Sequence, residues 1–497
     1  MKKYISTFVM SSILLASCSL DQDPISDYSQ ANVGENTGST SFTTKAEMQA
    51  AYDNMYTYIK NSGQTFWGLD FEVNTETRSD NAYAGTTDFP IAAIERNIQD
   101  PSNSNITRDW KGYLAGVSRA NVVIANVDSV PDATLTDAER KQWKAEAQIL
   151  RAWMYYDMVR FWGEVPLLPA VNVPSIASFE EVTALLYRER NSVQDVYADI
   201  IKNLEEALPY APAVNSGNKF LLSRAVANAL LAKVYAEIPV RNYAKTIAHC
   251  DAVIADGFSL LPDYADLFQL NDAKTDVKVR NSVESIFEIS YQGAYMWVGT
   301  ILGKNYLNAN DKITWARWVA PSRDLIAAFD SENDNIRKSQ AIVYESVGYE
   351  HYYDANNYPF VYKLRSNLNS IIKLRLADIL LLKAEALVAT GNLTDAATLV
   401  NQVRTRVNLP ALASSVTSSA DAMEAAVLKE RRLELAFEGH RWFDLLRSGK
   451  LVETMNTLNA RDAKRLPMKT FTEQTTLYPV PQSEIESNPK LTQNPGY

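Results

Sequence analysis

Leu230-Leu231-Ala232-Lys233 and Leu380-Leu381-Leu382-Lys383 are two copies of one short pattern, 150 residues apart. Both copies continue in the same way, with Ala, Asn and Val at 236, 242 and 253 in the first and at 386, 392 and 403 in the second. Leu and Ala at helical spacing, followed by a short turn and a second helical run, predict a helical hairpin in each place. Such spacing is typical of close packing, so we expect these hairpins to stack as a scaffold and not to carry chemistry.

The hairpins resemble the tetratricopeptide unit, and other helices are predicted around them. Capping boxes of the Thr-x-x-Glu type begin helices over about 44–63 and 136–162, and an apolar stripe predicts another over 110–124. Further helices are predicted over 190–208, 223–238, 242–256, 321–330, 370–390, 393–407 and 421–447. The chain is therefore predicted to be mainly α.

Long irregular stretches are predicted between the helical blocks, over 64–106, 257–320 and 340–369. Alternating residues on both sides of Asp354-Ala355-Asn356-Asn357 in the third stretch predict a minor β-hairpin. Loops of this length are commonly functional. The 26 Tyr, 9 Trp and 16 Phe of the chain are more than a helical core of this size needs, and many of them lie in these stretches.

Composition excludes several classes of protein. The 497 residues are 46% hydrophobic and 22% charged, which is typical of a folded globular chain and not of a disordered one. The formal charge of −10 disfavours nucleic acid as a partner, because it repels the phosphate backbone. Three His and two Cys offer little material for a metal centre or a disulfide framework, so no metal and no cofactor is expected.

The N-terminus is typical of a secretory signal, with Lys2 and Lys3 before a short apolar run. The run closes on Leu15-Ala16-Ser17-Cys18, which resembles a bacterial lipobox, so residues 1–17 are predicted to be cleaved and Cys18 to carry lipid. Residues 19–41 contain no Lys or Arg and are predicted, together with Cys18, to form a flexible leash. A single folded domain is predicted over 42–497. Acyl chains would hold it on a membrane without spanning it.

Near the C-terminus stands ERRLELAFEGHRWFDLLR, residues 430–447. This stretch closely resembles the C-terminal signature of the SusD-like (RagB/SusD) lipoproteins. AEAQILRAW at 145–153, FWGEVPL at 161–167 and the ending YPVP at 478–481 with LTQNPGY at 491–497 are similar to other blocks of that family. The resemblance covers essentially the whole chain. It implies an α-helical fold on tetratricopeptide-like hairpins, no catalysis, and capture of glycan at the outer membrane for a SusC-like TonB-dependent transporter barrel.

The signature itself is predicted to be structural. Glu430, Arg431, Arg432 and Glu434 lie within one or two helical turns, so pairing at spacings of three and four is expected. Gly439 is expected to adopt the left-handed conformation that ends the helix.

Sugar recognition needs exposed aromatic rings beside polar groups that bond hydroxyls. Two of the irregular stretches offer this mixture. The candidate carbohydrate-binding residues are Trp67, Asp70, Asn81 and Tyr83 in the first and Tyr295, Trp297, Trp315 and Trp318 in the second. The first stretch also holds Asp80, and Arg317 lies beside the last two rings.

Other functions stay open at this level. A surface glycoside hydrolase needs only two suitably spaced carboxylates, and 59 acidic residues are present, although no acidic motif, phosphate loop or nucleophile elbow stands out. A peptide-capturing protein or a structural helical-repeat adaptor of the same architecture is also possible. The adaptor would leave the aromatic loops without a role. Neither the particular glycan nor the stoichiometry with a transporter follows from the sequence.

Overall fold

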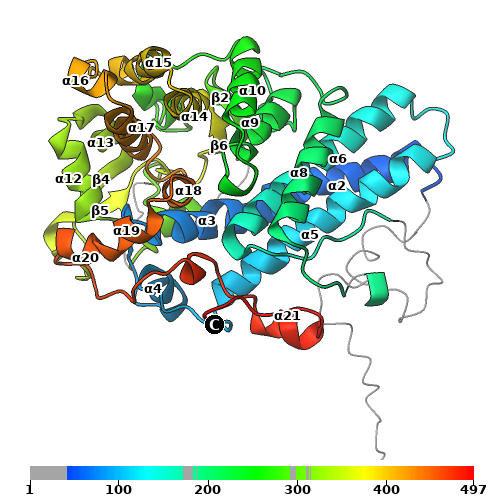
Figure 1. Ribbon diagram of the computed structural model, residues 1–497, viewed down its shortest axis with the longest axis horizontal. Coiled ribbons are helices and arrows are strands. Elements are labelled where there is room, and N and C mark those ends of the chain that lie inside the picture. The colour runs from blue at the N-terminus through cyan, green and yellow to red at the C-terminus, as the bar shows by residue number, and fades with distance from the viewer. Residues whose placement is uncertain (1–41, 172–182, 186, 292–297, 309–312, 314) are drawn as a thin grey trace, which may run out of the picture.

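The computed structural model describes residues 42–171, 183–185, 187–291, 298–308, 313 and 315–497. Four long helices run together through the right-hand half of Figure 1, and shorter elements fill the left-hand half. The long helices are α2 (Lys45–Gly63), α5 (Ser104–Asn126), α6 (Asp137–Trp162) and α8 (Val193–Ala207). The prediction of a mainly α fold is confirmed. The predicted signal and leash, with Cys18, lie outside the described residues.

The ends of these helices follow from local sequence. The Thr44 and Thr136 side chains accept hydrogen bonds from the backbone N–H groups of Glu47 and Glu139, which completes both predicted capping boxes. Gly163, with φ +73°, ends α6. Within the described residues, no helix combines the length and the hydropathy needed to cross a membrane.

Both predicted hairpins are confirmed. They are α9 (Arg224–Val234) with α10 (Tyr243–Ala255), and α14 (Leu376–Ala389) with α15 (Leu393–Arg406). The equivalent residues Asn242 and Asn392 each cap the second helix of their hairpin. Helix α10 packs against α14, so the two copies stack on each other. Their likeness to the tetratricopeptide unit stays a prediction.

The first predicted irregular stretch is wrong over residues 64–77. The chain passes from α2 into the π-helical turns η1 (Gln64–Leu69) and η2 (Val73–Thr77), with α3 (Asp70–Glu72) between them. Gly63 keeps right-handed helical angles, φ −61° and ψ −22°, and no Pro follows before 77, so nothing ends the helix. The buried side chains of Phe66, Leu69 and Val73 prolong its apolar face.

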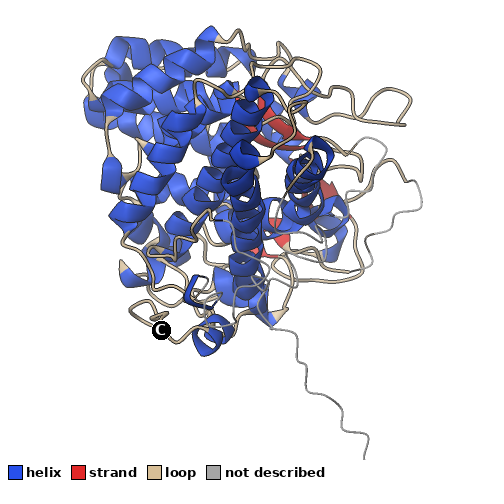
Figure 2. Ribbon diagram, turned by 90° about the vertical axis from the view of Figure 1, so that its right-hand side faces the viewer, coloured by secondary structure: helices blue, strands red, loops and turns tan. Residues whose placement is uncertain are grey.

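Within the described residues, three small antiparallel pairs of strands lie among the helices and appear red in Figure 2. The predicted hairpin is confirmed as β4 (Ile342–Glu345) with β5 (Tyr358–Val361). The other pairs, not predicted, join β1 (Ala82–Ala84) to β3 (Val319–Pro321) and β2 (Ser285–Ile289) to β6 (Ile371–Arg375). Strand β6 occupies residues predicted as the start of a helix, because they are recruited by β2 before α14 begins.

The predicted helix over 421–447 is broken into α17 (Ala420–Glu434) and α18 (Arg441–Arg447). Phe437 and Gly439 between them have φ +60° and +78°. A Cβ at Gly439 would lie 2.3 Å from Cδ1 of Phe71, so both the backbone angle and the packing require glycine there. The expected left-handed glycine is confirmed.

The remaining elements are short. The α-helices are α4 (Phe89–Glu95), α11 (Val298–Leu302), α12 (Arg323–Ser331), α13 (Asn335–Ala341), α16 (Ser414–Thr417), α19 (Leu451–Asn456), α20 (Leu458–Arg461) and α21 (Gln482–Ser487). The 3-10 turns are η3 (Val127–Ser129), η4 (Ile238–Val240), η5 (Tyr264–Leu267), η6 (Ala355–Asn357) and η7 (Gln474–Thr476).

The segment 474–497 returns to the long helices of the N-terminal half. Trp162 Nε1 donates to the Pro479 carbonyl at 3.1 Å, and Asn494 Nδ2 donates to the Trp162 carbonyl at 2.8 Å. The buried guanidinium of Arg78 lies between the rings of Trp442 and Tyr478, with 4.0 and 3.8 Å to their centroids. This segment therefore closes the N-terminal half from the outside.

Candidate functional site

The four candidate residues of the first stretch are all buried. Trp67 is 1% exposed, stands in the main hydrophobic core, and donates its Nε1 hydrogen to Asp157 Oδ2 at 2.8 Å. The expectation that its ring faces a ligand is wrong, because the π-helical turn directs it between α6 and strand β2, where it packs on Trp153 and Phe287.

The polar candidates and Tyr83 serve the interior as well. Asp70 is fully buried and pairs with Arg108 at 2.6 Å. Asn81 donates to Glu76 at 2.7 Å and accepts from Arg432 at 2.8 Å. Tyr83 bonds Asp462 and stacks on Tyr352 with ring centroids 4.1 Å apart. These interactions leave none of the three on a surface that a glycan reaches.

The second stretch is different. Trp315 is 44% exposed, and the Arg317 guanidinium lies 4.2 Å from its ring centroid. Arg317 is itself held by its Nε donating to the Gly303 carbonyl at 2.7 Å. Trp318 is half-buried against the main core. Tyr295 and Trp297 lie outside the described residues. Trp315 is therefore a fixed ring with open surface.

The pair β1–β3 brings the two stretches together. Ala84 faces Val319 in an antiparallel register, so the residues that follow β1 and those that precede β3 lie at the same end. Gly85 N donates to the Trp318 carbonyl at 3.0 Å, and a Cβ on Gly85 would lie 2.2 Å from the Arg317 carbonyl oxygen. Only glycine allows this approach of the two backbones.

Phe89 is an aromatic residue of the first stretch that does reach solvent, with 57% of its side chain exposed. It lies five residues after Ala84, at the start of α4, and Trp315 lies four residues before Val319. Sequence reasoning noticed Phe89 among the aromatics but did not choose it. Its setting after Thr86-Thr87-Asp88 and before Pro90 was the available signal, because an aromatic residue in such a polar turn has little core to enter.

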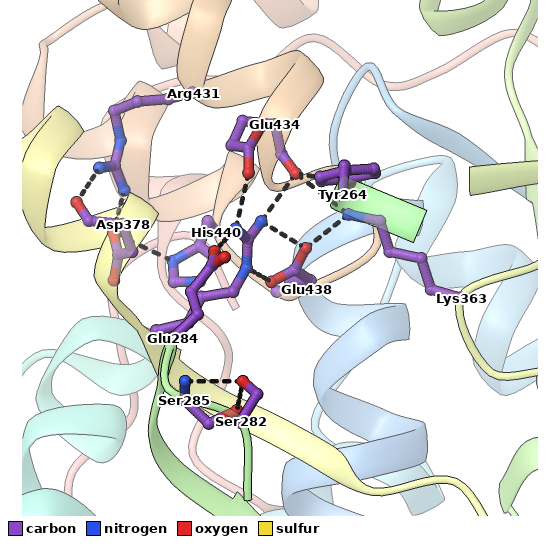
Figure 3. Close-up of polar contacts among 12 residues, drawn as sticks. Tyr264, Ser282, Glu284, Ser285, Lys363, Asp378, Arg431, Glu434, Glu438 and His440 are labelled. Atoms are coloured by element: carbon purple, nitrogen blue, oxygen red, sulfur yellow. Dashed lines mark hydrogen bonds and ion pairs between the residues drawn. The ribbon is translucent and has the colours of Figure 1, made fainter. Parts of the chain in front are cut away.

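The signature of 430–447 forms a buried charge network, as expected, but most of its partners come from distant elements. Figure 3 shows Glu434 and Glu438 beside Lys363 and Tyr264. Arg375 Nη1 lies 2.6 Å from Glu434 and 2.9 Å from Glu284, and Arg337 Nη1 lies 3.2 Å from Glu434. Among Glu430, Arg431, Arg432 and Glu434 the expected pairing at spacings of three and four is wrong, because each of them pairs with residues outside this set. In the helix that follows, Asp444 and Arg447 do pair at a spacing of three. Arg431 also pairs with Asp444 inside the signature, and the remaining ion pairs tie it to helices, strands and loops far away in the chain.

A second part of the network surrounds Asp378. Arg431 and Lys233 each lie 2.6 Å from its carboxylate. Burial, together with repulsion from Lys233, lowers the pKa of His440 to about 3 despite the attraction of Asp378. His440 is thus neutral at physiological pH and held among structural charges.

Asp70 and Asp109 are two neighbouring carboxyl groups that could be taken for an acid pair. Burial raises the pKa of both, and the Asp70 charge raises that of Asp109 further. Both side chains are fully buried, so neither touches a substrate bound outside. Within the described residues, no group of three or more His, Cys, Asp or Glu side chains is placed to hold a metal ion.

The fold and the strand pair β1–β3 define a class of protein, a helical scaffold that presents aromatic side chains on two joined loops. Comparison with known sequences shows which family this chain belongs to. The sequence profile of the SusD family matches residues 309–497, and a profile described as "Starch-binding associating with outer membrane" matches residues 32–236. The chain belongs to the SusD-like family.

Individual relatives are distant but align over most of their length. The "SusD-like protein P38" of Formosa agariphila is 27% identical over 92% of both chains. The "Starch-binding protein SusD" of Bacteroides thetaiotaomicron is 24% identical over 73% of this chain and 74% of its own.

Solved structures share the fold. A "Laminarin binding SusD-like protein" superposes with a TM-score of 0.70 at 23% identity, over 92% of this chain and all of that one. "Surface glycan-binding protein A" of Bacteroides thetaiotaomicron, in complex with laminarihexaose, gives a TM-score of 0.72 at 20% identity, over 91% of this chain and all of that one.

Proposed function

We propose that this protein captures oligo- or polysaccharide at the cell surface and delivers it to a TonB-dependent transporter barrel in the outer membrane. Membership of the SusD-like family supports this, as do the starch and laminarin that relatives are named for binding. The observation that carries the proposal is the presence of Trp315 and Phe89 on the two loops joined by β1 and β3, both open to solvent.

The side chains on the two loops joined by β1 and β3 suit a sugar. Pyranose rings offer apolar C–H faces that stack on indole and phenyl rings, and a ring with few rotatable bonds loses little entropy on binding. Arg317 holds the Trp315 ring from one side. Tyr295 and Trp297, which lie outside the described residues, and the half-buried Trp318 stay in the proposal as further contacts.

Titration of the full chain in mild detergent tests the proposal, with a panel of neutral glucans that includes starch and laminarin fragments. Replacing Trp315 by Ala should cost about 2 kcal/mol or more, roughly a thirtyfold loss of affinity, as for a binding hot spot. Tyr210→Ala is the matched control. Tyr210 is also an exposed aromatic residue, at 49%, but it lies three residues after the end of α8 and belongs to neither of the two loops. Wild-type affinity in both Trp315→Ala and Phe89→Ala would place the site elsewhere.

Delivery requires an anchor and a partner. The lipobox-like ending at Cys18 and the leash of 19–41 support attachment to the outer membrane with the folded part facing the exterior. Cys18→Ala should leave a folded protein that no longer partitions with membranes, and an unmodified Cys18 mass in the membrane-bound wild type would contradict the anchor. A cognate barrel should co-purify in mild detergent; gentle extraction that yields only monomer would contradict the partnership.

A surface glycoside hydrolase is the alternative from another class. The burial of Asp70 and Asp109 argues against that pair as catalysts. An assay for released reducing ends, run beside the titration, separates the two functions. Retention of glycan without release supports capture, whereas release supports an enzyme.

A further inference from the structure

A hollow is lined by residues of α2, η1, α5 and the start of α21. Figure 1 shows where these elements lie. The volume of the hollow is about 1150 Å³, above the range of roughly 300–1,000 Å³ that is usual for small-molecule pockets. None of the residues that line it belongs to the loops around Trp315 and Phe89. It is large enough for an extended ligand.

The floor of the cleft is shaped by small residues and two aromatic rings. A Cβ on Gly112 would lie only 3.1 Å from Cδ1 of Phe66, so this glycine lets α5 approach η1 closely. Tyr58 and Phe66 stack with centroids 5.9 Å apart, and the Tyr58 hydroxyl donates to the Gly112 carbonyl at 2.6 Å. Ala51 and Ala115 complete a shallow apolar base. Of the two rings, Phe66 is 2% exposed and only shapes the floor, whereas Tyr58 keeps part of its surface open to the cleft.

The charged side chains that line the cleft are all cations, Arg108, Lys111 and Arg119, although the chain as a whole carries −10. Asp70 holds Arg108 from the buried side at Nε and Nη2, 2.8 and 2.6 Å away, and leaves its side chain 42% exposed. Glu484 lies 3.7 Å from Lys111. These contacts fix the cations in place.

Arg119 belongs to the aromatic floor as well as to the charge. Its guanidinium lies 4.0 Å from the Tyr58 ring centroid and donates to Asn54 Oδ1 at 3.2 Å and to the Ala115 carbonyl at 2.9 Å. Around it, the rim is made of amides and hydroxyls, which bond sugar hydroxyls. They are Asn54, Asn61, Ser62, Thr65, Ser102, Ser104, Thr107, Ser118, Gln482 and Ser483.

We propose that this cleft is a second carbohydrate site, for glycan chains that carry carboxylate or sulfate groups. The open part of Tyr58 would contact the sugar ring, the rim its hydroxyls, and the three cations its anionic groups. The negative charge of the remaining surface is screened beyond about 8 Å at physiological salt, so close contacts with the cations decide the binding. The inference rests on the proposed function, because it assumes a glycan ligand.

The test is a titration of the full chain in mild detergent with oligogalacturonate, sulfated dextran, unmodified dextran and polyglutamate. Oligogalacturonate and sulfated dextran distinguish carboxylate from sulfate as the recognised group. The double variant Lys111→Gln with Arg119→Gln should lower the affinity for whichever anionic glycan binds by about tenfold, which is the effect expected from the loss of two exposed charges. Lys202→Gln with Lys464→Gln removes the same charge from exposed positions outside the cleft and should change nothing. Arg108 is left intact, because its loss would strand the buried Asp70 carboxylate.

Ala115→Trp fills the cleft without changing its charge and should abolish this binding, so the proposal does not depend on one variant folding. Binding of neither anionic glycan, equal binding of unmodified dextran or polyglutamate, or wild-type affinity in the cleft variants would overturn it. Trp315→Ala separates this proposal from the proposed function. Loss of anionic-glycan binding in that variant, with the cleft variants unaffected, would overturn the second site alone, whereas a chain that binds no glycan at all would overturn both.

Discussion

The stretches 64–84 and 298–318 are both rich in aromatic side chains, yet they use them in opposite ways. Trp67 and Tyr83 of the first stretch are 1% and 0% exposed, whereas Trp315 of the second is 44% exposed. The first continues a long helix and enters the core, while the second leads into an edge strand. The same composition therefore serves packing in one region and a surface in the other.

Polar partners explain the difference. The indole of Trp67 finds Asp157, and the hydroxyl of Tyr83 finds Asp462, so neither carries an unsatisfied polar group into the interior. Trp315 instead stacks its ring against Arg317, which leaves its remaining surface open. An aromatic residue in a long stretch thus indicates a binding surface only if the fold provides no buried partner for it.

Trp67→Ala should have the largest effect on stability of the substitutions considered. Removal of a fully buried indole should lower the free energy of unfolding by about 3–5 kcal/mol, because it leaves a cavity and takes one hydrogen-bond donor from the buried Asp157 carboxylate, which keeps its pairing with Arg160. Denaturant unfolding followed by fluorescence measures this. The folded fraction should keep its glycan affinity, and a stable variant with lost affinity would contradict the interior role.

Asp80→Asn should come next, at about 3 kcal/mol, because it removes one partner of a buried ion pair. Burial alone would raise the pKa of Asp80, but Arg432 and Arg441 hold it well below the usual range. The stabilisation is therefore present above about pH 4, the ordinary pKa of Asp, and is lost as pH falls below that value. Unfolding curves from pH 7 to pH 3 should show the gap between wild type and variant closing in acid; a constant gap would contradict the pairing.

Tyr83→Phe should have a smaller effect, about 1–2 kcal/mol. It keeps the stack on Tyr352 but removes the hydroxyl that bonds Asp462 and accepts from the Arg323 backbone at 3.0 Å. Chemical denaturation is again the measurement. If stability were unchanged while affinity for glycan fell, Tyr83 would belong with the surface rings after all.

Trp315→Ala should have the smallest effect on folding, within about 0.5 kcal/mol, because the ring is on the surface. Its effect should appear in glycan affinity and not in the unfolding curve. A loss of stability comparable to that of Trp67→Ala would show that the two stretches do not differ in the way described.

Local features of the fold were readable in the sequence, and contacts between distant residues were not. Thr44, Thr136 and the repeated asparagines at 242 and 392 act on backbone groups within three residues, so their roles follow from spacing. The partners of Glu434, by contrast, are Arg337, Arg375 and Arg406, which are 97, 59 and 28 residues away.

The candidate site was harder to predict from the sequence, because it also depends on contacts between distant residues. Whether Trp67 packs inside depends on Asp157, 90 residues further on, and the role of Gly85 depends on Arg317. Of the eight candidate rings and polar residues, Trp315 is the one that the described structure leaves with clear open surface, and Phe89 had to be found from its exposure. Composition located the two loops, but the register of β1 and β3 was needed to join them.

The return of segment 474–497 to the N-terminal helices affects when the chain can fold during synthesis. The hydrogen-bond partners of Trp162 are Pro479 and Asn494, which are synthesised 317 and 332 residues after it. The long helices therefore cannot complete their packing while the chain is still leaving the ribosome. We expect a ribosome-bound chain that stops before residue 470 to be cut by protease within 104–162, and protection of that region there would contradict the coupling. A polypeptide whose first half is completed by its last segment stays open through synthesis, which is the state in which an export channel can thread it.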